Sequence, residues 1–182
     1  MNSPLPLPPR LAAIHAELGI PEKHGTERGM VLHEEARTGE LVFIGRNPDG
    51  RELQLVQPAA TAWEAMRSAA QGDGVELIPI SAFRSVERQR EIIAGKLAAG
   101  RTITEILRYV APPGFSEHHT GRAIDIGTHG HLDLEEDFAS TPAYQWLAAH
   151  AGRLGFTLSY PPGGARGIAY EPWHWCWSAA RR

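Results

Sequence analysis

The sequence of 182 residues has little cysteine: Cys176 is the only one. A single thiol excludes an intrachain disulfide framework, so stability has to come from a hydrophobic core. A chain of this length can bury most of its apolar surface as one domain. Its hydrophobic content of 42% and charged content of 21% are ordinary for a globular protein. We therefore expect one small domain that folds without covalent cross-links.

Long hydrophobic runs and an excess of charge of one sign are also lacking. No segment approaches the roughly 20 apolar residues that span a bilayer. The proline-rich residues 1–9 lack the apolar segment of a secretory signal peptide. The formal net charge of -3 gives no electrostatic reason to expect a nucleic-acid partner. We expect no membrane span and no nucleic-acid binding. The chain as written predicts a cytoplasmic protein, unless a leader is missing from it or the protein is exported or released by another route.

Apolar periodicity and turn residues predict a mixture of helices and strands. Trp63, Met66 and Ala70 share one helical face, and helix-start signals occur at Ser85, Thr102 and Thr141. Helices are predicted over residues 10–18, 58–70, 86–99, 103–109 and 142–153. Strands are predicted over residues 30–34, 41–44, 52–56, 75–80, 122–126, 156–160 and 168–177, the first three as one antiparallel unit.

Two histidines and a carboxylate have the donor chemistry of a zinc site. His118 is followed seven residues later by Asp125, and His174 lies far downstream. Three nitrogen and oxygen ligands leave a fourth position for water, as in catalytic zinc sites. Gly121 predicts a turn into strand 122–126, and strand 168–177 would have to lie beside it to bring His174 close.

Other interpretations of these residues remain open. The three side chains could be hydrogen-bonded core residues, or a structural zinc site completed by Cys176. Cys176 could equally be a buried small apolar group. His119 could replace His118 as a ligand, although we expect it to face solvent or to support the ligands from behind.

Glu171 and Arg84 supply the charges that hydrolysis needs. Glu171 lies three residues before His174, where it could take a proton from water attacking a carbonyl and deliver it to the leaving amine. Arg84 lies between strand 75–80 and helix 86–99, where it could stabilise the developing oxyanion. The simpler alternatives are a salt bridge at a strand end for Glu171 and a helix-cap ion pair for Arg84.

Three separated motifs resemble those of the VanY-type D-alanyl-D-alanine carboxypeptidases. These belong to a group of zinc peptidases that includes D,D-dipeptidases, phage L-alanyl-D-glutamate endolysins and hedgehog domains. The similarity covers roughly residues 60–177. The motifs are Ser81-Ala82-Phe83-Arg84-Ser85 with Gln89, Ser116-x-His118-x-x-Gly121-x-Ala123-x-Asp125, and Glu171-Pro172-Trp173-His174.

The resemblance implies a fold and a role for each matched residue. The fold would be a single small α+β domain with a central antiparallel sheet flanked by helices. Residues 58–182 would form the catalytic part, with residues 1–57 as an arm and short strands packed on it or part of it. One zinc ion would be bound by His118, Asp125 and His174, with Glu171 as general base and Arg84 stabilising the transition state. Gln89 and Ser116 would contact the peptide, and Tyr160 would line the cleft.

The resemblance also implies an activity on bacterial cell walls. We expect a D,D-carboxypeptidase that removes the terminal D-alanine from peptidoglycan stem peptides, acting as a monomer. An L,D-carboxypeptidase or a phage-like endopeptidase would use the same metal site. A zinc-bearing binding module without turnover is a further alternative, but it would need neither Glu171 nor Arg84. The family usually works outside the cytoplasm, which conflicts with the missing leader.

Overall fold

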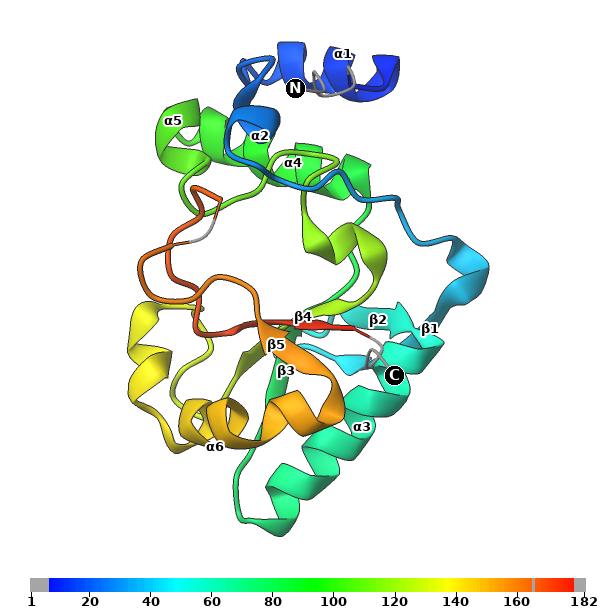
Figure 1. Ribbon diagram of the computed structural model, residues 1–182, viewed down its shortest axis with the longest axis vertical. Helices are drawn as coiled ribbons and strands as arrows, with labels where there is room; N and C mark the ends of the chain where they lie inside the picture. The colour runs from blue at the N-terminus through cyan, green and yellow to red at the C-terminus, as the bar shows by residue number, and fades with distance from the viewer. Residues whose placement is uncertain (1–6, 165, 179–182) are drawn as a thin grey trace.

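A four-stranded antiparallel sheet forms the centre of the protein. Figure 1 shows the computed structural model, which describes residues 7–164 and 166–178. The sheet has the order β3-β4-β6-β5. Its strands are β3 (Ile78–Ser81), β4 (Ala123–Gly127), β5 (Phe156–Leu158) and β6 (His174–Trp177). The expected α+β fold with a central antiparallel sheet is confirmed.

Helices lie on both sides of this sheet. In the view of Figure 1, helices α3 (Gln57–Gly72) and α6 (Pro142–His150) lie below it. Helices α4 (Val86–Ala98), α5 (Ile103–Ile106) and α2 (His24–Glu27) lie above it, and α1 (Pro9–Glu17) lies higher still. The sheet therefore separates a lower and an upper helical layer.

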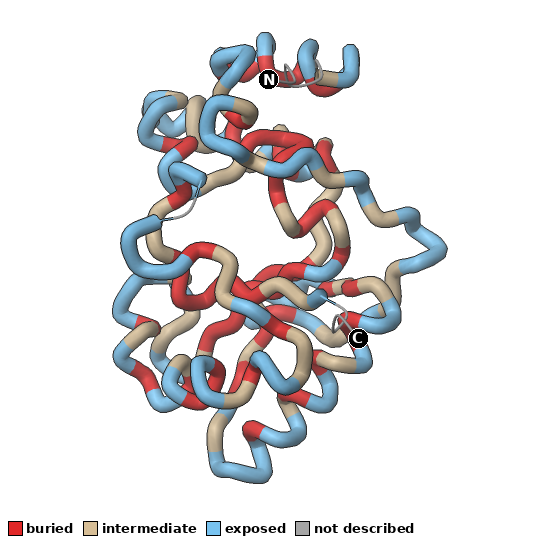
Figure 2. The backbone as a smooth tube through the Cα atoms, in the orientation of Figure 1, coloured by how far each residue is buried: buried red, intermediate tan, exposed pale blue. Residues whose placement is uncertain are grey.

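Two hydrophobic clusters hold these layers, and buried backbone in Figure 2 runs through both. The larger cluster joins Trp63 of α3 to Ile124 and Ile126 of β4 and to Trp175 of β6. The smaller one packs α1 against α4 and α5. Because side chains alternate along a strand, Asp125 of β4 points away from the larger cluster. The polar site therefore forms on the face of the sheet that looks toward α4.

The helix starts read from the sequence are confirmed. The Ser85 hydroxyl accepts a hydrogen bond from the Arg88 amide at 3.0 Å and begins α4. Thr102 and Glu105 bond reciprocally at the start of α5. Thr141 caps α6, whose first residue is Pro142. These local bonds satisfy amides that a helix end leaves unpaired, so they are predictable without knowledge of the tertiary fold.

The predicted three-stranded N-terminal unit is wrong, because only two of its strands form. Strands β1 (Leu41–Arg46) and β2 (Glu52–Val56) pair as a hairpin. Residues 30–34 are not a strand, although His33 and Ala36 donate single backbone bonds to Gly114 and His119, each 2.8 Å long. No neighbouring strand offers them a ladder. Residues 1–6 of the expected arm lie outside the described residues.

The last strand is also shorter than predicted, since β6 begins at His174 rather than at residue 168. Pro172 has no amide hydrogen to give to a sheet. The His174 amide instead donates to the Glu171 carbonyl at 3.1 Å, which closes a turn. This turn brings Glu171 close to His174. The expected strand at 75–80 likewise begins only at Ile78.

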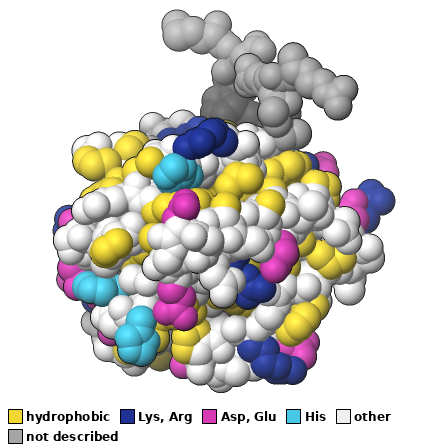
Figure 3. Space-filling model, turned by 90° about the horizontal axis from the view of Figure 1, so that it is seen from below, with side chains coloured by type: hydrophobic (Ala, Val, Ile, Leu, Met, Phe, Trp, Pro, Cys, Tyr) yellow, Lys and Arg dark blue, Asp and Glu magenta, His cyan; other side chains and the backbone are white. Residues whose placement is uncertain are grey.

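Several short helical turns escaped the sequence patterns. They are α2 and the 3₁₀ helices η1 (Thr38–Glu40), η2 (Glu117–Thr120) and η3 (Glu136–Ser140), whereas η4 (Ala151–Leu154) continues the helix predicted over residues 142–153. None of the helices in the described ranges has the length and hydrophobicity to cross a membrane. On the face seen in Figure 3, acidic, basic and hydrophobic side chains are interspersed.

Candidate metal centre and catalytic cleft

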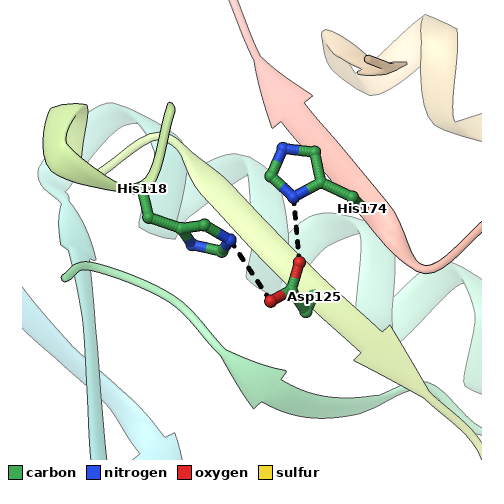
Figure 4. Close-up of side chains that lie close together, drawn as sticks. All are labelled: His118, Asp125 and His174. Atoms are coloured by element: carbon green, nitrogen blue, oxygen red, sulfur yellow. Dashed lines mark hydrogen bonds and ion pairs between the residues drawn. The ribbon is translucent and has the colours of Figure 1, made fainter. Parts of the chain in front are cut away.

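Three side chains from separate elements converge on one point (Figure 4). His118 comes from η2, Asp125 from β4 and His174 from β6. Asp125 and His174 are direct partners in the antiparallel register of β4 and β6, so their side chains share a face. Asp125 Oδ2 lies 3.2 Å from His118 Nε2, and its Oδ1 lies 2.9 Å from His174 Nδ1.

Gly121 turns the chain from η2 into β4. It adopts a left-handed conformation with φ of 64°, which other residues rarely take. A Cβ here would also come within 2.9 Å of a Leu41 methyl carbon. The turn predicted from this glycine is confirmed, and it is what brings His118 back over Asp125.

Hydrogen bonds fix which nitrogen of each ring faces the centre. His118 Nδ1 donates to the Ala82 carbonyl at 2.6 Å, which leaves Nε2 turned toward Asp125. His174 uses the opposite nitrogen, because its Nε2 donates to the Glu117 carboxylate at 3.0 Å and its Nδ1 faces Asp125. Such partners set the orientation of metal-binding imidazoles.

The charges around Asp125 fit a cation. Burial lowers the pKa of His118 to about 4, with the nearby Arg84 charge acting in the same direction. Burial alone would also lower the pKa of His174, but hydrogen bonds to Asp125 and Glu117 raise it to about 10. Burial would raise the pKa of Asp125, yet the two histidines hold it far below its usual range. A buried carboxylate thus depends on positive charge supplied by its neighbours.

The same three residues fit a metal ion. Their ligand atoms all lie within 4.8 Å of one another. His118 Nε2 is buried and has no hydrogen-bond partner, so its lone pair is available to a cation. Among the described residues no other group of metal-ligand side chains is gathered in this way. Cys176 pairs with Ala123 in the sheet, two residues along from Asp125, and is not part of the group.

His119 is buried rather than facing solvent, so that part of the expectation is wrong. Its Nδ1 bonds to the Arg84 carbonyl at 2.7 Å, and its Nε2 accepts the Gly114 amide at 3.0 Å. It therefore ties the loop before η2 to the turn that carries Arg84. His118 thus faces Asp125, whereas both ring nitrogens of the adjacent His119 are used by backbone groups.

The structure places Glu171 and Arg84 beside the three candidate ligands. Glu171 Oε2 lies 3.9 Å from His174 Nδ1, and burial raises the pKa of this carboxyl group to about 7. Arg84 Nη2 lies 3.8 Å from Asp125 Oδ2, and its amide donates to the His118 carbonyl at 3.2 Å. Burial lowers the pKa of Arg84, while Asp125 and Glu171 oppose this effect.

Gln89, Ser116 and Tyr160 line the same cleft as the candidate ligands, a cavity of about 650 Å³. Gln89 is 1% exposed, and its amide donates to the Ala111 carbonyl at 2.8 Å. Gln89 is therefore not an ordinary exposed position of helix α4. The Tyr160 ring lies 4.9 Å from the His174 ring.

Glu117 is the member of the site that sequence reasoning missed. Its Oε2 accepts hydrogen bonds from His174 and from the Ser159 hydroxyl. Burial would raise its pKa, but these bonds lower it to about 2, so the group is ionised. An acidic residue before a histidine motif carries no signal of a partner 57 positions away.

A protein-family model matches most of this chain. The model named VanY, D-alanyl-D-alanine carboxypeptidase, matches residues 52–180. The chain belongs to the VanY family. A curated relative, the putative carboxypeptidase YodJ of Bacillus subtilis, is 37% identical over 121 residues, which cover 64% of this chain and 43% of the relative. The chain thus spans less than half the length of that relative.

Solved structures of two carboxypeptidases or related peptidases are similar to this fold. The LdcB LD-carboxypeptidase, from a study of peptidoglycan recognition, matches with a TM-score of 0.70 and 30% identity, over 80% of this chain and 71% of that one. The vancomycin-resistance D,D-pentapeptidase VanY, a mutant solved in complex with Zn(II), matches with a TM-score of 0.60 and 26% identity, over 84% of this chain and 89% of that one.

Proposed function

We propose that the protein is a zinc-dependent carboxypeptidase that removes the terminal D-alanine from peptidoglycan stem peptides. The observation that carries this proposal is the convergence of His118 Nε2, Asp125 and His174 Nδ1 in a cleft, with Glu171 beside them. Membership of the VanY family supports the substrate class, and the Zn(II) complex of a related D,D-pentapeptidase supports the metal.

Zinc held by these three residues would polarise a peptide carbonyl and lower the pKa of water toward 7. Glu171, whose own pKa is raised to about 7, can accept the proton of that water and pass it to the departing amine. Arg84, whose Nη2 lies 3.8 Å from Asp125 Oδ2, would supply the positive charge that stabilises the developing oxyanion. Gln89 and Ser116 would hold the peptide, with Tyr160 as part of the cleft wall.

A second candidate is an L,D-carboxypeptidase, which the structural similarity to LdcB favours. The metal centre serves both reactions equally, because the difference lies in which terminal bond the cleft presents to it. A binding module without turnover would use neither Glu171 nor Arg84, whereas here each of these side chains lies close to a candidate ligand. By family, we also propose that the protein works on the cell wall as a monomer.

Defined stem peptides distinguish these activities. The zinc-loaded protein is incubated with a pentapeptide ending in D-alanyl-D-alanine and with the corresponding tetrapeptide, and the products are identified by mass. Release of D-alanine from the pentapeptide supports the D,D-carboxypeptidase, and release only from the tetrapeptide supports the L,D alternative. The Glu171→Gln variant, which keeps the shape of the side chain without a basic carboxylate, serves as the inactive control. Intact peptides after prolonged incubation would reject both activities.

A further inference from the structure

The catalytic cleft extends well beyond the metal centre. Its lining includes Lys96 in the last turn of α4 and Arg101 just after that helix, and also Asp133, Glu135 and Glu136 at and just before the start of η3. In Figure 1 these two groups lie on opposite sides, with α4 above and the yellow segment around residue 135 below. One wall of the distal cleft is therefore basic and the other is acidic.

The charged part of the cleft, lined by Lys96, Arg101, Asp133, Glu135 and Glu136, is called the distal cleft here. Helix α4 gives its distance from the end of the cleft near the candidate metal ligands. Gln89, Ile92 and Lys96 all line the cleft, and their spacing of three and seven residues puts them on one helical face. Seven residues of α-helix rise by about 10 Å. An extended peptide advances about 3.3 Å per residue, so this length corresponds to about three residues of substrate.

Within the part of the chain that the structure describes, the distal charges form no ion pairs. Charged residues on the outer faces of α3 and α4 are paired instead, as Glu64 with Arg67 and Arg88 with Glu91. The cleft thus keeps opposite charges apart on its two walls.

Gln89 supplies an independent sign that a peptide occupies the cleft. Gln89 lines the cavity, and its Oε1 is buried and has no hydrogen-bond partner among the described residues. The bond from Nε2 to the Ala111 carbonyl fixes the amide so that the oxygen remains free. A buried acceptor without a partner is unfavourable, and a peptide N–H of a bound chain would satisfy it.

We propose that the distal cleft binds a substrate carrying both an anionic and a cationic group, about three residues upstream of the scissile bond. The anionic group lies against Lys96 and Arg101, and the cationic group lies against the acidic wall. This inference rests on the proposed function, because the metal centre fixes which end of the peptide is cleaved. The protein therefore selects stems whose upstream side chains keep a free carboxylate and a free amine.

Four peptides of equal length test the charge requirement. They share one cleavable end and differ upstream, with both groups free, the amine acetylated, the carboxylate amidated, or both blocked. Each block is expected to lower kcat/KM about fivefold at low ionic strength, mainly through KM, since partly exposed charge pairs contribute little more. The preference is expected to shrink as salt is added.

Variants of each wall identify the groups responsible. The Lys96→Gln and Arg101→Gln double variant should lose discrimination against the amidated peptide and keep it against the acetylated one. The Glu135→Gln and Glu136→Gln double variant should behave in the opposite way. Arg88→Gln, on the outer face of α4, is the matched control and should change neither ratio.

The outcomes separate this inference from the proposed function. Equal kcat/KM for all four cleaved peptides would overturn the distal site while leaving the carboxypeptidase intact. If no peptide is cleaved, calorimetric binding to the Glu171→Gln variant decides the matter: affinities that fall as charges are blocked support the distal site without the activity. Equal affinities for the four peptides, or no binding at all, overturn the proposed distal site.

Discussion

Replacing Glu171 by glutamine should stabilise the metal-free protein, and increasingly so as the pH rises. Burial raises the pKa of this carboxyl group from 4.5 to about 7, so the folded state holds its proton more tightly than the unfolded state. The stability linked to that proton is complete below the unfolded pKa and is lost as pH rises through the folded one. At 1.36 kcal/mol per pKa unit, the full loss is about 3 kcal/mol.

Urea unfolding of chelator-treated protein at about pH 5 and about pH 8 measures this loss. The free energy of unfolding of the wild type, relative to Glu171→Gln, should fall by about 2 to 3 kcal/mol between the two conditions. Glu64→Gln, which neutralises an exposed carboxylate of α3, is the control. The free energy of unfolding of the wild type relative to Glu64→Gln should be the same at both pH values. Adding zinc should reduce the loss, because a cation nearby favours the carboxylate. A constant difference between wild type and Glu171→Gln at both pH values would refute the idea that Glu171 is a buried base.

Two further predictions concern residues behind the candidate ligands. Glu117→Ala should weaken zinc binding about tenfold at about pH 8, because the His174 ring loses the carboxylate that orients it. Competition with a chelator measures this affinity, and an unchanged affinity would reject that role for Glu117. His119→Ala should leave the Gly114 amide and the Arg84 carbonyl unpaired and cost about 1–3 kcal/mol of stability in urea unfolding, while zinc stoichiometry stays the same. Loss of the bound zinc in His119→Ala would instead make this histidine a ligand.

Much of the site could be predicted because its clues are local. Gly121 between His118 and Asp125 indicated the turn, and the need to bring His174 close required β6 beside β4, as the register of Asp125 with His174 confirms. Helix starts followed from hydroxyl caps and from the capping box, whose bonds lie within one turn of helix. Turns and helix starts depend on neighbours in sequence, whereas the pairing of β6 with β4 followed only from assigning His174 to the same site as Asp125.

The remainder depends on partners that sequence patterns do not name. Residues 30–34 have apolar character, but a strand needs a ladder, and this segment meets only isolated carbonyls such as that of Gly114. Glu117 looks like an ordinary exposed acid until the fold brings His174 and Ser159 to it. The burial of His119 likewise follows from two backbone groups that converge only in the folded chain.

Zinc titration of the metal-free protein tests the central claim most directly. Chelator-treated protein is mixed with increasing zinc, and D-alanine release from the pentapeptide is measured together with bound metal. We predict that activity is absent at first, rises in proportion to bound zinc and reaches its plateau at one ion per chain, and that His174→Ala neither binds that ion nor recovers activity. Full activity in the chelated protein, or unchanged zinc binding in His174→Ala, would contradict the account.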